Sequence, residues 1–117
     1  MRREDFEQLV LAALEALPDR FKEHLGNVDV QVMDWPDDDL LDALGIPDDE
    51  TLFGYYEGIS LTATPGPFEL PARILIFQRP IEEECDTPEE IVEEVRKTVL
   101  HEIGHHFGLS EDEVEHL

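Results

Sequence analysis

The 117-residue chain has the size of one domain, and its composition is that of a folded protein with a strongly acidic surface. Apolar residues make up 41% and charged residues 32% of the chain, which argues against a disordered segment. The 30 Asp and Glu residues outnumber the 8 Lys and Arg residues, for a formal net charge of -22. Such a charge repels a phosphate backbone and argues against nucleic acid as a partner. It attracts basic peptide segments, although it equally suits solubility in a salty milieu.

The sequence favours a cytoplasmic protein without a membrane partner. Cys85 is the only cysteine, so the chain has no internal disulfide and nothing indicates an oxidising compartment. Acidic residues directly follow Arg2 and Arg3, which does not fit a signal peptide. No segment approaches the roughly 20 apolar residues needed to cross a bilayer. We expect residues 1–117 to form a single domain.

The first half of the chain predicts a helix followed by a strand. Apolar residues recur at three- and four-residue steps from Phe6 to Leu17, the pattern of a core-facing helix that Pro18 ends. Alternating valines then predict a strand over Val28–Val32. Residues 34–51 are acidic and loop-like, with one or two helical turns around three leucines and with Trp35 expected to cover the core.

Two further strands complete a small mixed sheet. The segment Tyr55–Thr62 reads as a strand with a kink at Gly58. The uninterrupted apolar run Ile74–Phe77 predicts a central strand covered on both faces. Arg79 and Pro80 close this strand, and we expect the acidic run Glu82–Glu84 to be a solvated connection. The fold class is therefore α+β.

The segment from Thr87 to Gly108 predicts a long helix that carries a metal-binding motif. Thr87 is a capping hydroxyl, Pro88 suits the first helical position and Glu90 follows three residues after the cap. Gly108 is a typical C-terminal stop. Residues 101–105 read H-E-x-x-H, and this motif requires a helix.

The spacing of this motif has a chemical reason. His101 and His105 are four residues apart and share one helical face, so both imidazoles can bind one zinc ion. Zinc lowers the pKa of a bound water toward ~7. Glu102 projects about 100° around the axis and can serve as general base, then pass the proton to the leaving amine. The motif predicts hydrolysis of peptide bonds.

A catalytic zinc ion takes three protein ligands, so one more is needed. Residues 101–111 fit H-E-x-x-H-x-x-G-x-x-ligand, in which Gly108 lets the chain reverse below the metal. Glu111 falls at the ligand position. Asp112 competes with Glu111 for the role of third zinc ligand.

Through residues 100–112, the chain resembles the small bacterial zincin-like metallopeptidases with a metzincin-like or Asp-zincin-like motif. The likeness extends more loosely to the N-terminal helix, to residues 54–58 and to residues 74–81. It implies a minimal zincin fold, with a mixed sheet beside a C-terminal active-site helix. It also implies an edge strand, Tyr55–Thr62 by position, that pairs with an extended peptide substrate. The chain departs from metzincins in having no methionine after the motif, because Met1 and Met33 both precede it.

Other polar residues have simpler interpretations, and two other functions remain open. His106, His24 and His116 are expected at the surface or beside the ligands. Tyr55 and Tyr56 are strand residues, either of which could stabilise the oxyanion during cleavage. One alternative function is a non-catalytic acidic binding module on a zincin scaffold. The other is a different metal-dependent hydrolase such as a nuclease, which the charge disfavours.

Overall fold

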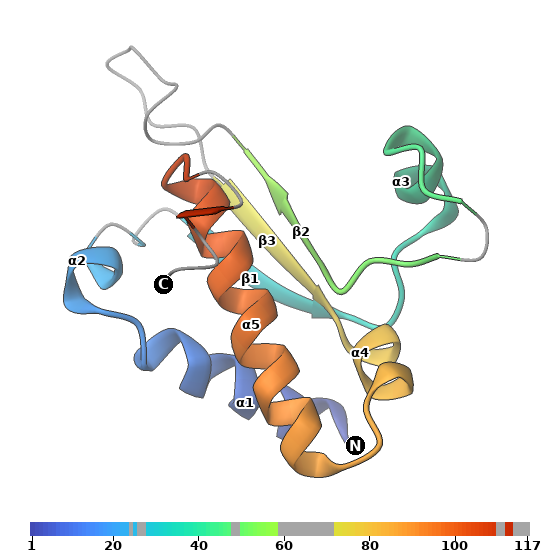
Figure 1. The fold of residues 1–117 in the computed structure, drawn as a ribbon, viewed down its shortest axis with the longest axis horizontal. Helices are drawn as coiled ribbons and strands as arrows, with labels where there is room; N and C mark the ends of the chain where they lie inside the picture. Colours follow the sequence, from blue (N-terminus) through green and yellow to red (C-terminus); the bar gives the residue numbers. More distant parts are fainter. Residues whose placement is uncertain (24, 26–27, 48–49, 59–71, 110–111, 114–117) are drawn as a thin grey trace.

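The computed structural model describes residues 1–23, 25, 28–47, 50–58, 72–109 and 112–113, which form an α+β fold (Figure 1). In chain order its elements are α1 (Arg3–Glu15), α2 (Asp19–Lys22), β1 (Val28–Met33), α3 (Asp38–Ala43), β2 (Gly54–Glu57), β3 (Ala72–Phe77), α4 (Gln78–Glu84) and α5 (Pro88–His106). The predicted fold class is confirmed. None of the helices in these described ranges is long and apolar enough to cross a membrane.

The described strands form a mixed sheet with the order β1-β3-β2. The central strand β3 runs parallel to β1, with Val30 opposite Ile74, and antiparallel to β2, with Tyr56 opposite Ile74. Among the described strands, β2 therefore lies at an edge of the sheet, as expected. It covers the first part of the segment predicted as a strand, and Gly58 follows it with a φ of 150°. Residues 59–62 lie outside the described residues.

The core lies between one face of the sheet and two long helices. Ile74 and Ile76 of β3 face this layer and are at most 1% exposed. Helix α1 contributes Phe6 and Val10, and α5 contributes an apolar stripe that contains Val95, Val99 and Ile103. Helices α1 and α5 pack against each other, and α5 also contacts β2 and β3 (Figure 1). Hydrophobic burial along this stripe fixes the position of α5 over the sheet.

Two local expectations about burial were wrong. Trp35 is 49% exposed and does not cover the core. Strand β3 is central but is not covered along its whole outer face, because Arg73 is exposed and Leu75 is only half-buried. Arg73 instead binds Glu57 across the two strands. A continuous apolar run cannot by itself distinguish a strand buried on two faces from one buried mainly on one.

The segment expected as a solvated connection is the helix α4. Pro80 is its third residue, where the backbone needs no N–H because the first turn of a helix has no intrahelical acceptors for its donors. Pro80 and Ile81 are buried, while Glu83 and Glu84 point to solvent. Glu83 and Glu84 thus form the exposed side of an amphipathic turn, while Glu82 is part-buried and pairs with Arg79.

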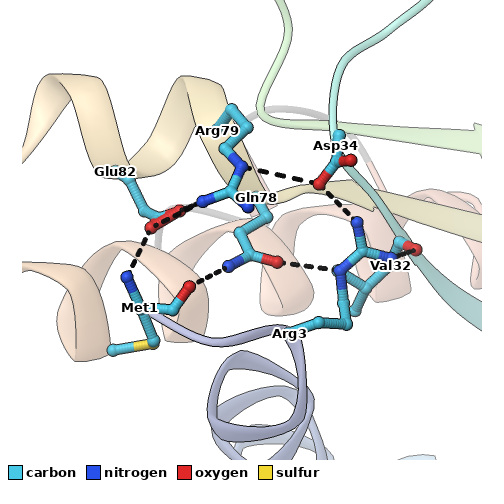
Figure 2. A network of polar contacts seen from close by, with 7 residues as sticks. All are labelled: Met1, Arg3, Val32, Asp34, Gln78, Arg79 and Glu82. Atoms are coloured by element: carbon cyan, nitrogen blue, oxygen red, sulfur yellow. Dashed lines mark hydrogen bonds and ion pairs between the residues drawn. The ribbon is translucent and has the colours of Figure 1, made fainter.

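A network of polar contacts joins the start of α1 to the ends of β1 and β3 (Figure 2). Gln78 is completely buried, accepts a hydrogen bond from Arg3 Nε at 2.9 Å and donates one to the Met1 carbonyl at 3.0 Å. Arg3 and Arg79 both bind Asp34. We call the set Met1, Arg3, Val32, Asp34, Gln78, Arg79 and Glu82 the polar cluster.

Candidate metal centre and cleft

Helix α5 begins at the predicted capping residue. The Thr87 hydroxyl accepts a hydrogen bond from the Glu90 backbone N–H at 3.2 Å, and Pro88 occupies the first turn. The Glu90 carboxylate reaches back to the Asp86 backbone N–H at 2.7 Å. Two N–H groups are therefore satisfied by side chains, and a cap of this kind contributes about 1 kcal/mol to helix stability.

Helix α5 ends in a Schellman motif built on Gly108. The Leu109 N–H donates to the Gly104 carbonyl and the Gly108 N–H donates to the His105 carbonyl, each at 3.0 Å. Gly108 has a φ of 71°, which glycine adopts without the steric cost that a side chain would carry. The predicted helix stop at Gly108 is confirmed, three residues after His105.

Three side chains of α5 converge at the motif. Ligand atoms of His101, Glu102 and His105 all lie within 4.8 Å of one another. The two imidazole rings have centroids 4.5 Å apart, and His105 Nδ1 lies 3.6 Å from Glu102 Oε2. Glu102 is 5% exposed, whereas the histidines are half-buried. The helix thus presents two imidazoles and a carboxylate at one end of a cleft.

This donor set fits a zinc ion. Imidazole nitrogen and carboxylate oxygen are both zinc ligands, and two atoms bound to one zinc ion lie at most about 4 Å apart. The observed spread of 4.8 Å is close to this limit, so small side-chain rotations would bring the donors together.

The cleft of about 520 Å³ lies between α5 and β2. Strand β2 and the residue before it line one side with Phe53, Gly54, Tyr55 and Tyr56. Helix α5 lines the other side with the three motif residues and with Glu94, Lys97 and Thr98. Leu44 and Leu52 complete the lining. A cleft of this size accommodates a few residues of an extended peptide.

Gly54 allows α5 to approach β2 closely beside the motif. A Cβ atom at this position would lie 2.8 Å from Thr98 Cγ2 and 3.2 Å from Glu102 Cγ. Real Cβ atoms essentially never show separations below 3.0 Å, so a side chain here would force the Thr98 side chain, α5 or the strand to shift. Gly54 therefore fixes the distance between the cleft strand and the Glu102 side chain.

A second contact joins β2 to the end of α5. Tyr56 Oη and His106 Nδ1 form a hydrogen bond of 2.9 Å, and His106 is 4% exposed. The rings of Tyr56, His106, Phe107 and Phe21 follow one another with centroid separations of 5.7, 5.4 and 4.9 Å. Burial raises the pKa of the Tyr56 phenol. His106 is thus a buried packing residue, not a surface one.

The remaining predicted residues are distributed as follows. Glu111, His24 and His116 lie outside the described residues. Asp112 is exposed and belongs to no cluster of possible metal ligands within the described ranges. The identity of a third ligand therefore stays a prediction. The cleft is also lined by three residues that were not singled out from the sequence, namely Gly54, Thr98 and Lys97. For Thr98 and Lys97, the only available signal was the spacing of residues 94, 97, 98 and 101, which places them on one side of a helix.

A helix that presents H-E-x-x-H across a cleft from an antiparallel edge strand defines a zincin-type fold. A protein-family model described as zincin-like metallopeptidase matches residues 25–117, and the chain belongs to this family. A conserved hypothetical protein from T. thermophilus has a similar structure, with a TM-score of 0.62 and 23% sequence identity. The match covers 92% of this chain and 94% of that one, and at this identity it shows the fold alone. No curated protein matched the sequence.

The family and the convergent side chains together support a metallopeptidase in general. The family implies a metal, typically zinc, and His101, Glu102 and His105 could bind one.

Proposed function

We propose that this protein is a zinc-dependent peptidase in which Glu102 is the general base. One observation carries the proposal: the ligand atoms of His101, Glu102 and His105 lie within 4.8 Å of one another in a cleft bordered by an edge strand. Structural zinc sites use closed sets of cysteines and histidines, whereas His101 and His105 line an open cleft, and the Glu102 carboxylate beside them can serve as the base. That arrangement suits hydrolysis.

Each motif residue has a distinct part in the proposed reaction. His101 and His105 hold the metal, which when bound supplies Lewis-acid activation of water and of the peptide carbonyl. Glu102 takes a proton from the attacking water and delivers it to the departing amine. Its burial keeps the carboxylate in place between Gly54 and His105. Glu111 or Asp112 is the third ligand in this proposal.

The substrate is a peptide bound in extended form along β2. An edge strand has unpaired backbone N–H and C=O groups on one side, which an extended peptide can pair with. The net charge of -22 attracts peptides with basic segments at long range. Because a chain of this length can form few deep side-chain pockets, we expect shallow or narrow peptide selectivity and no broad activity on folded proteins.

The test is metal content by mass spectrometry after zinc loading, combined with cleavage of a peptide library. We expect stoichiometric zinc in the wild type and its loss in His101→Ala, because one imidazole fewer leaves an incomplete site. Glu102→Gln should retain zinc and lose cleavage, because the amide cannot accept the proton. Comparison of Glu111→Ala with Asp112→Ala identifies the third ligand by the drop in zinc affinity.

The matched control for Glu102→Gln is Glu83→Gln, which removes the same charge from an exposed position on α4. It should retain both zinc and cleavage. Cleavage that survives in Glu102→Gln would contradict the assignment of the base. A wild type that takes up no zinc would contradict the peptidase as a whole and favour a non-catalytic acidic binding module.

A further inference from the structure

Lys97, a basic residue that lines the cleft, differs from the other basic residues of the chain in its pairing with acidic groups. All 8 Lys and Arg residues lie in the described ranges. Six form a salt bridge with a carboxylate, namely Arg2, Arg3, Lys22, Arg73, Arg79 and Arg96. Arg20 lies over the ring of Phe21, 4.8 Å from its centroid. Lys97 forms no ion pair with any described residue, despite the large excess of acidic groups.

Glu93 and Glu94, which precede Lys97 by about one helical turn, form no salt bridge with it among the described residues. Glu93, one helical turn before it, is bound through both carboxylate oxygens by Arg96, at 2.6 and 3.1 Å. Glu93 therefore interacts with Lys97 only through space. Glu94 lines the same cleft, and no salt bridge joins it to Lys97 among the described residues. The Lys97 ammonium group thus keeps its capacity for a negatively charged ligand.

The position of Lys97 relates this cation to the candidate metal centre. Lys97, His101 and His105 are spaced by four residues and therefore share one face of α5, and all three line the cleft. The helix rises about 6 Å between Lys97 and His101. An extended peptide spans about 3.3 Å per residue, so this distance corresponds to about two substrate residues.

We propose that Lys97 binds a carboxylate of the peptide substrate and is a specificity-determining residue of the cleft. A lysine ammonium group carries three N–H donors and no acceptor, and its charge-assisted hydrogen bonds to carboxylate are stronger than those to neutral groups. A peptide offers this chemistry as an Asp or Glu side chain or as its free C-terminus. The inference rests on the proposed peptidase function.

The acidic surface and Lys97 act over different ranges. Charges farther apart than about 8 Å are largely screened at physiological ionic strength, so at close contact Lys97 dominates over the distant carboxylates. A peptide with basic residues outside the cleft and one carboxylate inside it would be attracted by the acidic surface at long range and bound by Lys97 at close range.

The experiment compares paired peptides with the zinc-loaded wild type, Lys97→Gln and Lys97→Glu. Members of one set of internally quenched peptides differ only by Glu or Gln at a single position, and members of a second set only by a free or amidated C-terminus. The wild type should prefer the carboxylate member by about five-fold in kcat/KM, mostly through KM. Lys97→Gln should abolish this preference and Lys97→Glu should invert it. The set that shows the preference identifies the source of the carboxylate.

Lys22→Gln is the matched control, because it removes the same charge from α2, outside the cleft. It should keep the wild-type preference, and zinc content should be equal in all four proteins. A preference that persists in Lys97→Gln, or equal cleavage of both members by the wild type, would overturn the proposal.

A binding measurement separates this proposal from the peptidase function. Fluorescence anisotropy of the same peptide pairs, labelled with the fluorophore but without the quencher, reports affinity for zinc-loaded Glu102→Gln without turnover. Tighter binding of the carboxylate member that disappears in Glu102→Gln/Lys97→Gln supports the role of Lys97 even if no peptide is cleaved. Equal affinity for both members, or no binding of either, would contradict the proposed role of Lys97.

Discussion

The polar cluster joins polar side chains from distant parts of the chain, whereas the polar side chains that converge in the cleft come from one turn of α5. In the polar cluster, opposite charges alternate and the Gln78 amide uses both its oxygen and its nitrogen. In the cleft, two imidazoles and a carboxylate, all able to offer lone pairs, converge within 4.8 Å. Mutual pairing of donors and acceptors holds a fold together, whereas convergence of acceptor atoms prepares a site for a cation.

The sharpest way to break the polar cluster is Gln78→Leu. The variant removes the buried amide and leaves the Arg3 Nε–H group without that acceptor. We expect the free energy of unfolding in urea to fall by about 3 kcal/mol, since two part-buried hydrogen bonds are lost and both the Arg3 Nε–H group and the Met1 carbonyl lose their partner. Zinc binding to the folded fraction should be unchanged. A drop in zinc affinity of the folded protein would show that the two regions are coupled.

Gly54→Ala tests the packing of the cleft. The new Cβ would meet Thr98 Cγ2 at 2.8 Å, and we expect a loss of about 2 kcal/mol in unfolding free energy together with weaker zinc binding. The double variant Gly54→Ala/Thr98→Ala removes the nearest clashing atom and should recover part of both losses. Additive effects in the double variant would mean that the contact does not limit the approach of α5.

Tyr56→Phe is a milder change in the same region. It deletes the hydroxyl bonded to His106 Nδ1 and keeps the ring in the aromatic row. The expected loss of unfolding free energy is about 1 kcal/mol, measured by thermal or urea denaturation. Peptide cleavage should decrease little if the phenol has no part in oxyanion stabilisation. A loss of cleavage by more than about 100-fold with zinc retained would assign it that part.

Cys85, which directly follows α4, gives the smallest expected effect. Its thiol pKa is raised above the ordinary 9.0, first by burial and then by the carboxylates of Glu94 and Glu90. The thiolate is the reactive form, so alkylation by iodoacetamide at pH 8 should be slower than for a cysteine in a short peptide. Glu94→Gln should lower the pKa and accelerate the reaction. A rate equal to that of the peptide would contradict the raised pKa.

The sequence predicted the helix that carries the motif better than the surroundings of that helix. Thr87, Pro88 and Gly108 act through local hydrogen bonds and backbone conformation, and such signals lie within a few residues of where they act. The Tyr56–His106 bond joins positions 50 residues apart, and the two Gln78 bonds of the polar cluster join positions 75 and 77 residues apart, which no local pattern reports.

Burial was harder to predict than secondary structure. Trp35 was expected to cover the core, yet it lies just after β1 and is 49% exposed. Helix α4 was missed because Pro80 was interpreted as a break, although proline is tolerated in a first helical turn. The motif residues were brought together as expected, but their roles and the third ligand stay predictions.

The packing of α1 against α5 would link the proposed metal uptake to the folding of the whole chain. Helix α1 ends at Glu15 and α5 begins at Pro88, so the layer that supports His101 and His105 forms only after a long loop closes. Ribosomal synthesis must therefore deliver α5 before this layer exists. An apparent zinc affinity obtained from unfolding curves would include the free energy of joining these two helices, and deletion of α1 should weaken it.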